Sequence, residues 1–109
     1  MKKSNYIAGQ WVEGTSSIKN INPSDTSEII DEYTSCTDEQ FEQSIRSAAG
    51  AQKEWETVGI EKKSQILTKI GDELIQKSKI IGELLSREEG KPLNEGIGEV
   101  SRAGQQFQY

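Results

Sequence analysis

Residues 87–100 read REEGKPLNEGIGEV, and this stretch predicts the end of one helix and the start of another. Glycine just past a helix and proline soon afterwards are its usual stop signals, so the first helix ends before Gly90 and Pro92. The next helix has a face made of Leu93, Ile97, Val100, Gly104 and Phe107. Because no stop signal precedes Tyr109, we expect this chain to be the leading part of a larger protein.

Three further helices are predicted between Cys36 and this corner, because apolar residues recur there every three to four positions. A capping box of Thr37 and Gln40 starts the first helix, since each side chain can bond the other residue's backbone N–H. Gly59 interrupts the pattern, and Ser78 starts the third helix. The residues on the three helical faces are Phe41, Ile45, Ala48, Gln52 and Trp55; Ile60, Lys63, Leu67, Ile70 and Leu74; and Ile80, Ile81, Leu84 and Leu85.

Residues 5–35 predict short antiparallel strands. Apolar pairs at 6–7 and 11–12 flank Ala8-Gly9-Gln10, which predicts a hairpin with a glycine available for a positive φ angle. Asn22-Pro23-Ser24-Asp25 is a turn sequence, because proline fixes φ and the Asn and Asp side chains bond nearby backbone groups. The remaining apolar residues of the predicted strands are Ile18, Ile21, Ile29, Ile30 and Tyr33.

Composition excludes several classes of protein. The net charge is −5, from 13 basic and 18 acidic residues, and the scattered basic residues form no positive face for nucleic acid. No apolar run approaches membrane-spanning length, and residues 1–3 lead into polar sequence instead of a signal peptide. A single cysteine, Cys36, agrees with a reducing compartment. We therefore expect a cytoplasmic protein that binds neither nucleic acid nor a membrane.

No local pattern predicts an active site. The chain has no histidine, which removes the usual general base and the commonest metal ligand. Cys36 alone is interpreted as a small residue at a strand-to-helix junction. Helical spacing places Glu99 three residues before Arg102, so the carboxylates are interpreted as a solvated, ion-paired face. This acidic cluster consists of Glu88, Glu89, Glu95 and Glu99.

Two further patterns have structural interpretations. Gly96-Ile97-Gly98 lies within a helical face, so it is interpreted as a site of close helix packing or of a slightly weakened first helical turn, and not as a phosphate-binding loop. Trp11 and Trp55 each lie on an apolar face, so both are interpreted as core residues and not as a ligand-stacking pair.

Taken together, the landmarks resemble the N-terminus of the NAD(P)-dependent aldehyde dehydrogenase superfamily, over essentially the whole chain. The matching features, in order, are residues 6–12, the turn at 22–26, a capped helix ending near Trp55, Ile66-Leu67, and residues 88–92. A narrower resemblance is to the 2-oxoglutarate-semialdehyde (2,5-dioxovalerate) dehydrogenases, which oxidise a carboxylated aldehyde. It rests on residues 5–11, 22–27, 87–91, 95–100 and 102–105.

The resemblance implies an α/β enzyme in which residues 1–109 are the N-terminal part of the cofactor-binding domain. Small antiparallel strands and turns would occupy residues 5–35, and about four amphipathic helices would occupy residues 37–109. In such enzymes a cysteine thiolate attacks the aldehyde, hydride passes to the nicotinamide of NAD or NADP, and a glutamate-activated water releases the acid.

The family's catalytic cysteine, glutamate and asparagine, and its glycine-rich cofactor motif, fall beyond residue 109. The resemblance therefore implies no catalytic residue and no cofactor-binding residue in this chain, and we expect the segment alone to be inactive and to bind no cofactor. The implied partners are the remainder of an aldehyde dehydrogenase chain and further copies in a homo-oligomer.

The resemblance also implies a metal site, in which a structural monovalent cation is held by the backbone carbonyl of Ile21 and the carboxylate of Glu88. Carbonyl and carboxylate oxygens suit a hard cation, and a remaining ligand would come from sequence beyond residue 109. Two rival hypotheses stay open. One is a free-standing interaction module that pairs through its unburied helical faces, and the other is a truncated product without function.

Overall fold

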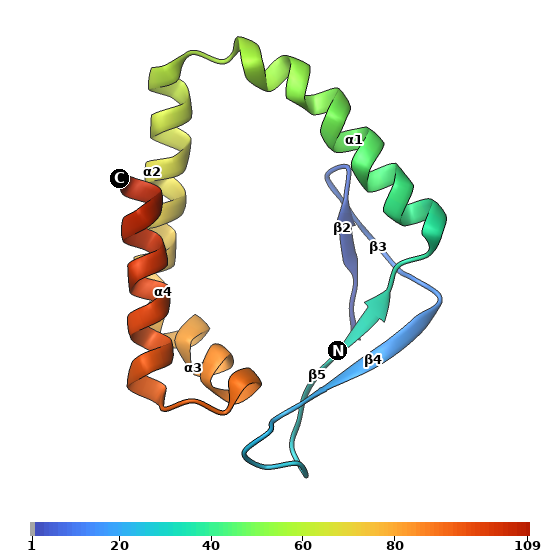
Figure 1. Cartoon of the computed structure of the whole chain (residues 1–109), viewed down its shortest axis with the longest axis vertical. Coiled ribbons are helices and arrows are strands. Elements are labelled where there is room, and N and C mark those ends of the chain that lie inside the picture. The colour runs from blue at the N-terminus through green and yellow to red at the C-terminus, as the bar shows by residue number, and fades with distance from the viewer. Residues whose placement is uncertain (1) are drawn as a thin grey trace. The chain divides into compact units, whose positions relative to one another are not determined.

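The computed structural model describes residues 2–109, in which short strands are followed by four helices (Figure 1). This order confirms the fold class predicted from the sequence. No helix in that range is long and apolar enough to cross a membrane. The strands are β1 (Lys2–Lys3), β2 (Asn5–Ile7), β3 (Gln10–Val12), β4 (Ser16–Ile21) and β5 (Ile29–Ser35), and the helices are α1 (Asp38–Thr57), α2 (Ile60–Gln76), α3 (Ser78–Glu89) and α4 (Leu93–Gln108).

The chain divides into two compact units. The first contains Met1–Ile21 and Ser27–Thr57, and the second contains Asn22–Thr26 and Val58–Tyr109. Helix α1 contacts β2 and therefore groups with the strands, whereas the turn between β4 and β5 groups with the later helices.

In the first unit, β2 and β3 form the predicted hairpin. Tyr6 lies opposite Trp11, and Ile7 lies opposite Gln10, so the connection is the two-residue turn Ala8-Gly9. The φ angles of Ala8 and Gly9 are 51° and 80°, and two positive values are the pattern of a type I′ turn. The hairpin prediction is confirmed, with a turn one residue shorter than expected.

The second sheet of this unit has β5 at its centre, with β4 antiparallel on one side and β1 parallel on the other. The Thr34 hydroxyl oxygen accepts a hydrogen bond from the Gly14 N–H (2.7 Å), and the hydroxyl donates to the Ser16 carbonyl (3.3 Å). These bonds fix the segment between β3 and β4 to the sheet. The antiparallel pairing predicted for residues 5–35 is confirmed, and β1 adds a parallel pair before it.

Helix α1 begins with the predicted capping box. The Thr37 N–H donates to Oε1 of Gln40 (2.9 Å), and the Gln40 N–H donates to Oγ1 of Thr37 (3.1 Å). Nε2 of Gln40 also donates to the Glu13 carbonyl (2.7 Å), which ties the helix start to the residues after β3. The helix nevertheless buries none of its residues, and the predicted face containing Phe41 and Ile45 stays exposed.

In the second unit, α4 runs beside α2 and contacts α3 (Figure 1). A Cβ atom on Gly71 would lie 2.5 Å from the Gly104 carbonyl oxygen, and one on Gly82 would lie 2.5 Å from the Ile97 Cα atom. Only glycine permits backbones to approach this closely. The buried residues of these helices are accordingly small: Gly71, Gly82, Ser86, Gly96, Val100 and Gly104.

The core interpretation of Trp11 and Trp55 is wrong, since these side chains are 72% and 42% exposed. Strand alternation places Trp11 and Tyr6 on one face of the hairpin, with ring centroids 4.9 Å apart, and the buried Ile7 on the other. Trp55 belongs to α1, which buries no residue. Within residues 2–109, the buried hydrophobic side chains are those of Ile7 (7% exposed) and Val100 (6%).

Candidate functional site

The corner at residues 90–92 joins α3 to α4 and ends α3 as the sequence predicts. Gly90 has the left-handed backbone angles φ 70° and ψ 26°, which residues with a Cβ atom rarely adopt. The N–H groups of Gly90 and Lys91 both donate to the Ser86 carbonyl, at 2.9 and 3.2 Å. The buried Ser86 hydroxyl donates to the Pro92 carbonyl at 3.3 Å. Ser86 therefore bonds to all three residues of the corner.

The turn at residues 22–26 contacts this corner within the second unit. Oδ1 of Asn22 accepts a hydrogen bond from the Ser24 N–H (2.8 Å), which closes the turn. The Ser24 hydroxyl donates to the Gly90 carbonyl (3.4 Å). A Cβ atom on Gly90 would lie 2.8 Å from Oγ of Ser24 and 3.0 Å from Cγ of Pro23. Two motifs far apart in the sequence thus form one contact.

Lys91 bridges two carboxylates at the corner. Its Nζ atom lies 2.6 Å from Oε2 of Glu89 and 2.7 Å from Oε1 of Glu99, and its side chain is 17% exposed. The hydrogen bonds to Glu89 and then to Glu99 raise the pKa of Lys91 above its ordinary 10.5, while partial desolvation opposes the rise. The charged ammonium group therefore ties the end of α3 to α4.

The role of Lys91 is one that sequence reasoning missed. The expected ion-pair partner of Glu99 was Arg102, on the same helix, whereas the structure pairs Glu99 with Lys91, eight residues earlier and before the turn. Helical spacing describes contacts inside one helix only. The available signal was the position of Lys91 beside a glycine and a proline that reverse the chain between two acidic residues.

A cavity of about 440 Å³ lies at the corner. All of its lining residues except Leu93 are polar or charged, with charges of both signs, and they are Asn22, Ser24, Glu83, Ser86, Arg87, Lys91 and Leu93. The lining contains no thiol, and the chain has no histidine to activate a serine. The hydrogen bonds and ion pairs at this site brace the junction of α3 and α4, and no covalent chemistry follows from them.

The two predicted cation ligands lie in different units. Ile21 is the last residue of β4, and Glu88 is half-buried in the last turn of α3. Among residues 2–109 there is no group of three or more His, Cys, Asp or Glu side chains that could hold a metal ion. One carbonyl and one carboxylate make only part of the oxygen shell that a hard cation takes. The cation site therefore stays a prediction.

The remaining candidates are Cys36 and the two glycines of the Gly96-Ile97-Gly98 motif. Cys36 is exposed and lines a cavity of about 220 Å³ in the first unit together with Asn5 and Phe41. A Cβ atom on Gly96 would collide with Ser86, as the helix-packing interpretation predicts, whereas a Cβ on Gly98 meets nothing within 4 Å. The packing interpretation is thus confirmed for Gly96 and does not apply to Gly98.

Comparison with known proteins identifies relatives over almost the whole chain. A model of the aldehyde dehydrogenase family matches residues 11–109. The chain is 39% identical over 95 residues to aldehyde dehydrogenase family 7 member A1 of Pisum sativum, a match that covers 87% of this chain and 18% of the relative. It is 33% identical over 99 residues to malonate-semialdehyde dehydrogenase 2 of Bacillus mycoides, covering 90% and 20%. It is 32% identical over 107 residues to alpha-ketoglutarate semialdehyde dehydrogenase of Haloferax volcanii, covering 96% and 22%.

Solved structures share the same arrangement. The NADP-dependent glyceraldehyde-3-phosphate dehydrogenase of Bacillus halodurans, complexed with NADP, matches with a TM-score of 0.94 and 28% identity. That match covers 99% of this chain and 23% of the solved chain. A betaine aldehyde dehydrogenase of Staphylococcus aureus, in complex with NAD⁺, matches with a TM-score of 0.90 and 25% identity, covering 98% and 22%.

The chain belongs to the aldehyde dehydrogenase family, as the match over residues 11–109 shows. It spans about a fifth of the length of the curated relatives it matches. The superfamily resemblance is therefore confirmed. Relatives named for different semialdehydes match the same region, so the comparisons support the family and leave the substrate subgroup open.

Proposed function

We propose that this chain is the N-terminal scaffold segment of the cofactor-binding domain of an NAD(P)-dependent aldehyde dehydrogenase, and that it is inactive alone. The observation that carries the proposal is the match of 99% of this chain to 23% of an NADP-bound dehydrogenase, at a TM-score of 0.94. Exposed apolar helical faces, such as that of Phe41 and Ile45, fit a segment that packs against a larger body.

The whole enzyme would oxidise an aldehyde to a carboxylic acid: the added oxygen comes from water, a hydride passes to NAD⁺ or NADP⁺, and a proton is released. The role of residues 1–109 in it is mechanical. The corner bonds of Ser86 and the ion pairs of Lys91 hold α4 against α3, and α4 packs on α2. We place the complete protein in the cytoplasm as a homo-oligomer, in keeping with the sequence expectations.

For the substrate we propose 2-oxoglutarate semialdehyde, a carboxylated aldehyde. The support is the sequence resemblance together with 32% identity to the Haloferax volcanii relative, which covers 96% of this chain. Malonate semialdehyde is the competing substrate, because the Bacillus mycoides relative is 33% identical over a similar span. The rate of NAD(P)H formation by the native enzyme with each semialdehyde decides between them.

We also propose the monovalent cation site at the Ile21 carbonyl and the Glu88 carboxylate, completed by a ligand outside this chain. Titration of the native enzyme with sodium or potassium should raise its unfolding temperature, because an ion that binds only the folded state stabilises it. Glu88→Gln should abolish the rise. An unchanged rise in that variant removes Glu88 from the site.

The experiment that tests the main proposal is the intact mass of the native gene product, captured with an antibody to residues 37–75. A species several times larger than 12.1 kDa supports a scaffold segment within a dehydrogenase. A species at 12.1 kDa contradicts it. Aldehyde oxidation by the purified 109-residue chain would also overturn the proposal, because the segment is proposed to lack the catalytic residues.

A second candidate function is a free-standing interaction module, and one observation favours it. Helix α1 buries no residue, and its Phe41, Ile45 and Trp55 side chains are exposed. An exposed apolar surface of this kind is typical of a protein–protein interaction site. Unfolding of the 109-residue chain that depends on protein concentration would support the module, and cooperative unfolding independent of concentration would count against it.

A further inference from the structure

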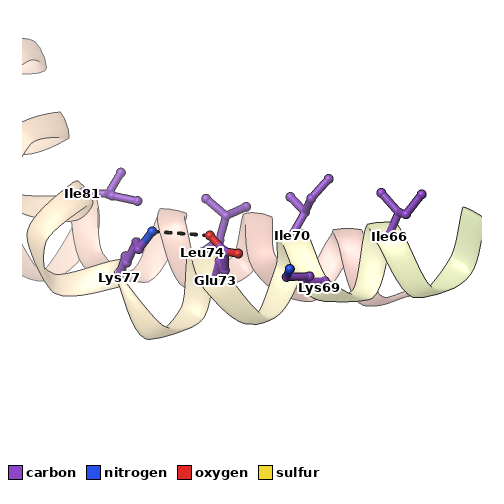
Figure 2. Close-up of a pocket in the computed structure, with 7 residues that line it drawn as sticks. All are labelled: Ile66, Lys69, Ile70, Glu73, Leu74, Lys77 and Ile81. Carbon is purple, nitrogen blue, oxygen red and sulfur yellow. Dashed lines mark hydrogen bonds and ion pairs between the residues drawn. The ribbon is translucent and has the colours of Figure 1, made fainter. Parts of the chain in front are cut away.

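We draw no further inference here: the strongest candidate, the apolar groove of about 490 Å³ that Ile66, Ile70, Leu74 and Ile81 line along α2 and the first turn of α3 (Figure 2), carries none, because it is one of several exposed apolar faces and nothing in the structure shows what covers it.

Discussion

Gly82 of α3 and Ile97 of α4 approach so closely that a Cβ atom on Gly82 would lie 2.5 Å from the Ile97 Cα atom. The Ile97 atoms that an added Cβ would meet belong to the backbone, so they cannot rotate away. Room for a side chain at residue 82 would require movement of a whole helix.

Gly82→Ala should therefore destabilise the chain by about 1–3 kcal/mol, the usual cost of overpacking. Gly98→Ala is the matched control, because its Cβ meets nothing within 4 Å and the change lies in the same helix pair. Alanine there should stabilise by about 0.5–1 kcal/mol through helix propensity. Urea unfolding followed by circular dichroism measures both. If both substitutions changed the free energy of unfolding in the same direction, the result would contradict the close approach of Gly82 to Ile97.

Gly90→Ala should destabilise for two reasons. The left-handed conformation costs a residue with a Cβ atom roughly 1–2 kcal/mol, and the new methyl group would press on Ser24 and Pro23. Gly50→Ala, in α1 and without close neighbours, should instead stabilise. Ser24→Ala in the Gly90→Ala background should recover part of the loss, because it removes the hydroxyl at 2.8 Å. If the change in the free energy of unfolding of the double variant equals the sum of the changes in the two single variants, the result would argue against that contact.

The ion pairs of Lys91 predict a dependence of stability on pH. Because the pKa of Lys91 is raised above 10.5 in the folded state, its contribution is fully present below 10.5 and is lost as the pH rises through the raised value. Lys91→Met should lower the unfolding temperature at neutral pH, and the difference from wild type should shrink above pH 10.5. Lys53→Met, on the exposed helix α1, is the control. Its difference in unfolding temperature from wild type should not shrink above pH 10.5. A constant difference across this pH range would exclude the charge as the cause.

The hairpin turn predicts a stabilising substitution. Ala8 has a φ of 51°, a conformation that asparagine adopts more readily than alanine. Ala8→Asn should therefore stabilise the chain by about 0.5 kcal/mol. Gly9→Ala should destabilise it by roughly 1 kcal/mol, because Gly9 has a φ of 80°. Thermal unfolding monitored by tryptophan fluorescence compares the two, and a loss of stability in Ala8→Asn would contradict the turn geometry.

Features with local causes could be predicted from the sequence. The capping box of Thr37 and Gln40 forms within four residues, and the Gly90 stop needs only a positive φ at the end of a helix. The Ala8-Gly9 turn is likewise a matter of neighbouring residues. In each case the residue types and the backbone conformation that they favour lie in one short segment, so the pattern specifies the structure.

Features that depend on distant partners could not be predicted. Periodicity marked Ile70 and Leu74 as a face to be buried, but the face of α2 that meets α4 contains Gly71. An apolar pattern states which residues favour burial and does not name the surface that covers them. Trp11 is exposed for the same reason, and the pairing of Lys91 with Glu99 depends on a chain reversal that no helical spacing describes.

The hydrogen bond between Ser24 and Gly90 joins residues 66 positions apart. During synthesis on the ribosome, the turn at residues 22–26 emerges long before its partner exists. At about 5–20 residues per second, the wait is roughly three to thirteen seconds. The strands β4 and β5 can pair in that interval, but the turn between them gains its contact only after α3 has been made. A pause in translation before codon 90 would therefore lengthen the time during which this turn is open to proteases.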